Sequence, residues 1–153
     1  ITPMNAHAAK AVAQSATYAG PTKGFVEEVY LLEPLANADG RALAILKNAA
    51  GDKATSLRWS VKELPYLTQW KNTAAEADGY VTGIEPATGY PFNRRVERQF
   101  GRVPKLAPQQ TRSFTLDFGL HVGPNSVKQL EEEAKAVQGS RAVEVRTEPP
   151  KIE

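Results

Sequence analysis

The sequence predicts an all-β chain of antiparallel strands followed by one late helix. Short runs rich in β-branched and aromatic residues are separated by turn signals, of which Asp39-Gly40 is the strongest. In several of these runs apolar and polar side chains alternate, which is the period of a strand with one buried face. A single segment, which begins near Ser126, has apolar residues at helical spacing.

This pattern divides the chain into four segments. Residues 1–20 are rich in alanine and end at Gly20-Pro21, so we expect an irregular N-terminal arm. Residues 21–122 hold the strands. A helix is expected over 123–139, and residues 140–153 are expected to form a mobile tail.

The strands follow from the alternation and from the turns between the runs. They are expected at 26–35, 41–47, 56–62, 64–71, 79–84 and 111–120. The last is the most regular, because Phe114, Leu116, Phe118 and Leu120 fall on one face. Residues 86–108 contain four prolines and are predicted to form a long loop.

The helix is predicted from its apolar stripe and its expected ends. Ser126 with Gln129 is typical of a capping box at the N-terminus, and Gly139 is a stop signal. The residues expected to face the protein are Val127, Leu130, Ala134 and Val137.

Composition excludes several functions. The 153 residues carry a formal charge of +2, which is too small to indicate nucleic-acid or membrane binding by bulk electrostatics. There is no cysteine, so thiol chemistry is excluded, and neither His7 nor His121 has metal-ligand spacing around it. We therefore expect no metal and no cofactor, and the cellular location stays open.

Glu85 is the first candidate for chemistry. It ends a predicted strand and is followed by Pro86, so its carboxylate is mounted on a stiff backbone at the rim of a sheet. A general base needs such a mounting, because its oxygen must stay within hydrogen-bond reach of a substrate proton. The alternative is a solvated acid at a strand end. The arginines at 94, 95, 98 and 102 are interpreted as a solvated or structural cluster.

Two further segments could bind a substrate. Trp70 offers a flat apolar face for a sugar ring, and Lys71 and Asn72 offer donors for hydroxyl groups. The alternative is a core tryptophan beside a surface lysine. Glu27 and Glu28 are adjacent on a strand, so one must point to each face of the sheet.

With these segments the sequence resembles a known superfamily. Residues 79–93 (GYVTGIEPATGYPFN), with "LPYLTQWKN" and "FVEEVY" in the same chain, look like a bacterial branch of the aldose 1-epimerase (galactose mutarotase-like) superfamily. The resemblance implies an antiparallel β-sandwich that corresponds to the C-terminal half of a larger super-sandwich. It also implies that Glu85 is the general base that removes the anomeric proton, and that Glu27 binds sugar hydroxyls.

The same resemblance places Trp70, Lys71 and Asn72 in the cleft with Glu85 and Glu27. The histidine that acts as the acid belongs to the other half of the family fold, so this chain alone is expected to be inactive. Two hypotheses remain: part of a sugar epimerase, or a carbohydrate-binding module without turnover. The expected partners are a monosaccharide or sugar derivative, and either the missing N-terminal half or a second copy of the chain.

Half of a super-sandwich would lack partners for some of its strands. Leu57 and Trp59 on one strand, and Leu116 and Phe118 on another, are expected to supply two inner faces. A reduced sandwich could close between these two faces, but because half of the fold lacks its partners we expect extensive exposed apolar surface or pairing between chains.

Overall fold

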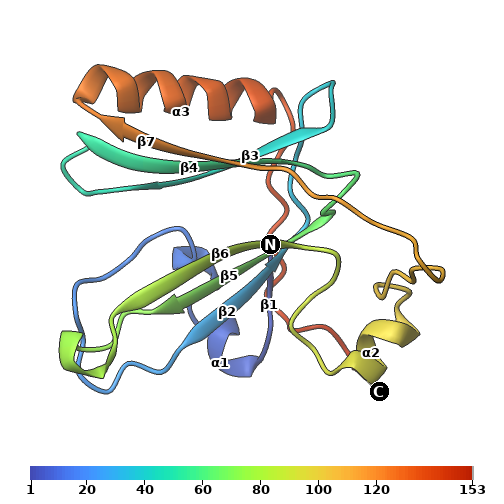
Figure 1. The fold of residues 1–153 in the computed structure, drawn as a ribbon. Helices are drawn as coiled ribbons and strands as arrows, with labels where there is room; N and C mark the ends of the chain where they lie inside the picture. Colours follow the sequence, from blue (N-terminus) through green and yellow to red (C-terminus); the bar gives the residue numbers. More distant parts are fainter. Residues whose placement is uncertain (153) are drawn as a thin grey trace. The chain divides into compact units, whose positions relative to one another are not determined.

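The computed structural model describes residues 1–152, which form two compact units. The first unit comprises residues 1–33, 66–103 and the segment from 143 onward, and the second comprises 34–65 and 104–142. Each unit contains one antiparallel sheet, and the second also contains a long helix (Figure 1). The predicted fold class, antiparallel β with one late helix, is confirmed.

The first unit is built on a four-stranded sheet in which every neighbouring pair is antiparallel. The strand order is β1-β2-β5-β6, so the sheet joins the start of the chain to its middle. The strands are β1 (Thr2–Pro3), β2 (Glu28–Leu32), β5 (Tyr66–Asn72) and β6 (Val81–Ala87).

Short helices accompany this sheet. Ala8 and Val12 pack on Tyr30, so the N-terminal segment covers one face of the sheet. Residues 1–20, expected to be an irregular arm, therefore contribute a strand, a helix and part of the core. The helices of this unit are α1 (Ala6–Ala9), η1 (Val12–Gln14), η2 (Glu76–Asp78) and α2 (Arg94–Gln99).

The second unit is a three-stranded sheet covered on one face by a helix (Figure 1). Val127 and Leu130 of the helix are buried against Ala54 of the sheet. The strand order is β3-β4-β7. Its elements are β3 (Arg41–Lys47), β4 (Lys53–Ser60), β7 (Leu116–Val122) and α3 (Pro124–Gln138).

The face of this sheet away from α3 carries an exposed apolar strip along β7. Phe118 is 79% exposed, Leu120 78% and Val122 66%. Phe118 pairs with Leu57 across the ladder, so the two predicted inner faces lie on one face of a single sheet, and that expectation is wrong. The expectation of exposed apolar surface is confirmed for the chain as it stands.

The structure corrects three local predictions. Helix α3 begins after Gly123 with Pro124 in its first turn and has no side-chain cap, so the capping box at Ser126 is wrong. Strand β6 continues through Pro86, which is tolerated because β6 is an edge strand. The predicted loop 86–108 contains α2, which Asn93 caps by accepting a hydrogen bond from the Arg95 amide.

Candidate active site

Four of the five predicted site residues lie on the same face of the first unit's sheet, and the fourth of them, Asn72, lies at the end of β5. Glu85 on β6 is opposite Thr68 on β5, and Trp70, two residues further along β5, shares that face. Glu27 precedes β2 and reaches the same face, since its carboxylate accepts a hydrogen bond from the Trp70 indole. We call Glu27, Trp70 and Glu85 the carboxylate–indole wall.

The Glu85 side chain lies along its own strand, over Gly83. A methyl group placed on Gly83 would be 2.2 Å from Glu85 Oε1. Gly83 is directly opposite Trp70, and opposing Cβ positions in an antiparallel pair are about 4.5–5.5 Å apart. Glu85 Oε1 is therefore within about 8 Å of the Trp70 Cβ. The carboxylate is exposed and can be reached by a substrate.

The Trp70 ring is held by Glu27. The indole Nε1 donates a hydrogen bond of 2.7 Å to Glu27 Oε2, which uses one acceptor of that carboxylate and fixes the ring on this face. Trp70 is half-buried and Glu27 is exposed. Because β2 and β6 lie on opposite sides of β5, the two carboxylates flank the indole from its two sides. A half-exposed indole between hydrogen-bond acceptors suits a sugar ring, which has apolar C–H surfaces and hydroxyl donors.

Lys71 does not belong to this wall, which corrects the expectation that it shares a cleft with Glu85. It follows Trp70 directly, so the two-residue period of the strand sends it to the opposite face. There its Nζ lies 3.3 Å from Glu28 Oε2 and donates to the Gln14 carbonyl at 3.2 Å. Both charged side chains of this pair are buried.

The buried pair is part of a polar network that sequence reasoning missed. The Tyr30 hydroxyl donates a 2.8 Å hydrogen bond to Glu28, and burial together with this bond raises the pKa of Tyr30, so the phenol stays protonated. Lys71 Nζ also lies 5.3 Å from the centre of the Tyr18 ring. The signal was present in the adjacent acids, because one had to meet the buried side.

Asn72 is on the same face as Trp70 by strand parity, at the end of β5. Its amide nitrogen makes a long contact of 3.5 Å with the Gly79 carbonyl, which links the two ends of the β5–β6 connection. Asn72 therefore lies at the margin of the wall rather than beside Glu85.

The segment after Glu85 is anchored by a buried ion pair, so the structural interpretation of the arginine cluster holds for Arg102. Arg102 donates two hydrogen bonds to Glu97, at 2.8 and 2.6 Å, and the Tyr90 amide donates a third at 2.9 Å. Burial alone would raise the pKa of Glu97, but these bonds and the Arg102 charge outweigh it and hold the pKa below its usual range. The Tyr90 ring packs on the Tyr66 ring of β5, with 4.7 Å between the ring centres, so the segment is fixed to the sheet.

Neither histidine is hydrogen-bonded to the wall among the described residues. His7 Nε2 lies 3.3 Å from the Val26 carbonyl oxygen, and His121, in the second unit, lies 2.9 Å from Ser56 Oγ. Within residues 1–152, no group of three or more His, Asp or Glu side chains is arranged to hold a metal ion. None of the helices described is both long and apolar enough to cross a membrane.

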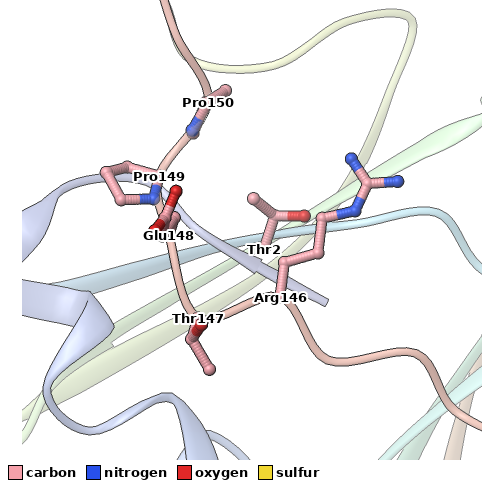
Figure 2. A pocket seen from close by; sticks show the side chains of 6 residues that line it. All are labelled: Thr2, Arg146, Thr147, Glu148, Pro149 and Pro150. Carbon is pink, nitrogen blue, oxygen red and sulfur yellow. The ribbon is translucent and has the colours of Figure 1, made fainter.

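The first unit also has a cavity of about 370 Å³ between Thr2 and the C-terminal segment (Figure 2). Thr2 shares a cross-strand row with Glu85, through Leu31 and Thr68. Leu31 and Thr68 are both buried, so the cavity is not continuous with the carboxylate–indole wall. The other residues that line it are Arg146, Thr147, Glu148, Pro149 and Pro150.

Comparison with solved structures defines the class of protein. The chain is similar to a crystal structure from Klebsiella pneumoniae subsp. pneumoniae MGH 78578, provisionally assigned as an aldose 1-epimerase, with a TM-score of 0.95 at 38% sequence identity. The match covers 99% of this chain and 40% of that one, so the chain spans about two fifths of that protein's length. The fold is a β-sandwich of the aldose epimerase type, within the galactose mutarotase-like superfamily.

More particularly, the chain belongs to the family described as "Domain of unknown function (DUF4432)", which matches residues 1–120. No curated protein matches the sequence.

Proposed function

We propose that this chain carries the general base and the sugar-binding wall of an isomerase that interconverts the α and β anomers of an aldose. The observation that carries the proposal is the exposed Glu85 carboxylate beside Trp70 on one face of the sheet. The similarity to a protein provisionally assigned as an aldose 1-epimerase supports the same reaction. The resemblance of residues 79–93 to the segment that carries the family's base supports the role of Glu85.

The reaction requires one base and one acid. Glu85 removes the proton from the anomeric hydroxyl as the bond between C1 and the ring oxygen breaks, and an acid delivers a proton to that oxygen. Rotation about the C1–C2 bond and ring closure on the other face of the carbonyl give the second anomer, and both protons return. Trp70 holds the apolar face of the sugar, and Glu27 accepts a hydrogen bond from a sugar hydroxyl group with lone pairs that the Trp70 indole does not use.

The acid is proposed to come from outside this sequence. Among residues 1–152 neither imidazole hydrogen-bonds to the wall, and the family resemblance places the acid in the other half of the fold. General acid–base groups typically contribute about 10²- to 10⁴-fold each, so the chain alone is expected to be slow.

Polarimetry tests the proposal. A freshly dissolved pure anomer is mixed with the protein, in a chain that includes the rest of the fold, and the change in rotation is followed. The wild type should accelerate equilibration, and Glu85→Gln, which keeps the shape but removes the base, should lower kcat by about 10²- to 10⁴-fold. Full activity in Glu85→Gln would rule out the assignment of the base.

A carbohydrate-binding module is the second candidate, and one observation favours it: the wall has an indole face and carboxylate acceptors, but neither histidine of the described residues is hydrogen-bonded to it. This function predicts saturable sugar binding that depends on Trp70, without any change in the rate of anomer exchange. Polarimetry distinguishes the two, because only the isomerase accelerates anomer exchange. Calorimetry over a panel of monosaccharides tests the binding that both require, and no binding to any of them would count against both.

The apolar strip on β7 is proposed to contact a further part of a longer chain. Phe118, Leu120 and Val122 form an exposed apolar strip, which is typical of an interaction surface, and the similar Klebsiella protein is longer than this chain. Because the sequence has no cysteine, Leu120→Cys gives a unique thiol probe, with Lys128→Cys on the exposed side of α3 as control. The Leu120 probe should react fast in this chain and slowly in a longer protein. Slow reaction in this chain at high concentration would indicate a second copy instead.

A further inference from the structure

The position of the Glu85 carboxylate depends on a residue with no side chain. Glu85 bends back along β6, and its Oε1, Cδ and Cγ would lie 2.2, 3.1 and 3.3 Å from a Cβ on Gly83. Side chains two residues apart on a strand share a face, so this space belongs to residue 83. The carboxylate occupies it only because residue 83 is glycine.

Gly83 also sets the distance between the Glu85 carboxylate and the Trp70 indole. Gly83 is directly opposite Trp70 in the β5–β6 ladder. With no side chain at residue 83, nothing on β6 separates the Glu85 carboxylate from the indole. A Cβ there would fill the space beside Trp70 and would turn the carboxylate away from it.

We infer that Gly83 is a positioning residue: it places the Glu85 carboxylate beside Trp70, where the base meets the anomeric hydroxyl of a bound sugar. The effect of Gly83 on catalysis rests on the proposed function, but its effect on the position of the Glu85 carboxylate can be tested separately. Gly83 does not touch the substrate, so it acts through Glu85.

Gly83→Ala is a clean perturbation. The φ angle of Gly83 is not positive, so an alanine at this position fits the backbone without strain. The predicted clash is with the end of a flexible side chain, which rotates away without moving the strand. To reach an ordinary contact distance Oε1 must move by about 1 Å or more. A misplacement of about 1 Å can lower the rate by about 10²-fold.

Gly20→Ala is the matched control. Gly20 also has ordinary backbone angles, and a Cβ there would meet no atom within 4 Å. Both variants exchange glycine for alanine, and only one of them displaces the carboxylate.

The first experiment is an NMR measurement on this chain, which needs no activity. Wild type and Gly20→Ala should show a cross-relaxation peak between the Glu85 γ-protons and the residue 83 α-protons. Gly83→Ala should keep the dispersion of a folded protein, and its Glu85 γ-protons should show no strong peak to the new methyl group at position 83, because the side chain has turned away. A missing peak in the wild type, or a strong peak between the Glu85 γ-protons and the methyl group in Gly83→Ala, would overturn the inference.

The second experiment is a double-mutant cycle in the polarimetric assay, in a chain that includes the rest of the fold. Gly83→Ala should lower kcat by about 10- to 10²-fold with little change in KM, and Gly20→Ala should change neither. In the Gly83→Ala background, Glu85→Gln should cost at least about tenfold less than in the wild type. Additive effects, or full activity of Gly83→Ala, would overturn the inference. Full activity of Glu85→Gln would instead overturn the proposed function.

Discussion

Lys71→Met tests where the structure places this lysine. The side chains of Lys71 and Glu28 are only 5% and 9% exposed, and the ammonium is 3.3 Å from the carboxylate. Removing the ammonium leaves a carboxylate in a buried site with the Tyr30 hydroxyl as its remaining hydrogen-bond donor. Breaking a buried pair in this way typically costs about 3–5 kcal/mol of unfolding free energy, because the other charge stays uncompensated.

The matched variant is Glu28→Gln combined with Lys71→Met. It removes both charges and keeps an acceptor for the Tyr30 hydroxyl, so its unfolding free energy should return close to the wild-type value. Urea denaturation followed by circular dichroism measures both. With a slope of about 1–3 kcal/mol per molar urea, the Lys71→Met midpoint should fall by at least about 1 M.

The reasoning would be refuted by a Lys71→Met protein that unfolds within about 1 kcal/mol of the wild type. It would also be refuted if the variant kept its stability and lost sugar affinity. That result would show that the ammonium faces a ligand rather than Glu28.

Two further predictions follow from the wall and from the segment after it. Because the pKa of Glu97 is lower in the folded protein than in the unfolded chain, its contribution to stability is present above about pH 4.3 and is lost as the pH falls through the folded value. Acid titration of the unfolding free energy should show this loss below about pH 4, and Glu97→Gln should remove that part of the dependence; a variant with the wild-type acid profile would contradict the assignment. Trp70→Phe keeps an aromatic ring but loses the hydrogen bond to Glu27, so sugar affinity should fall by about tenfold at nearly constant stability. Calorimetry measures the affinity and urea denaturation measures the stability. Unchanged affinity would show that Trp70 is not part of the sugar-binding site.

Much of the fold could be predicted from local sequence patterns. The strand at Arg41–Lys47 was predicted with its full bounds, because the turn signal at Asp39-Gly40 precedes it and Ala50-Gly51 follows it. The late helix was predicted from its stripe. Of the four residues expected to face the protein, Val127 and Leu130 are buried, and Ala134 and Val137 are only partly buried. The start of the helix was not predicted correctly, because the helix begins at Pro124 after Gly123 without any side-chain cap.

Long-range pairing could not be predicted in the same way. The neighbours β1 and β2, and β4 and β7, are far apart in the sequence, and nothing local encodes their pairing. The apolar alternation of β7 indicated a buried face, but alternation does not say what covers that face, and Phe118 is exposed.

The candidate site could likewise be predicted only where local sequence determines it. Strand parity was enough to separate Glu27 from Glu28 and would also have separated Trp70 from Lys71. Lys71 and Trp70 were expected in one cleft because they are adjacent in the sequence, but a strand places adjacent side chains on opposite faces. The role of Gly83 depends on the rotamer of Glu85, which no sequence pattern contains.

NMR titration of the protein with monosaccharides tests directly whether a sugar binds on the carboxylate–indole wall. If it does, the Trp70 indole N–H and the backbone amides of Gly83 and Glu85 should shift in a saturable way. The side-chain signals of Glu28 and Lys71, which lie on the opposite face of the same strands, should stay unchanged. Saturable shifts confined to Glu28 and Lys71, or to the Thr2 cavity, with none at Trp70, would contradict the account.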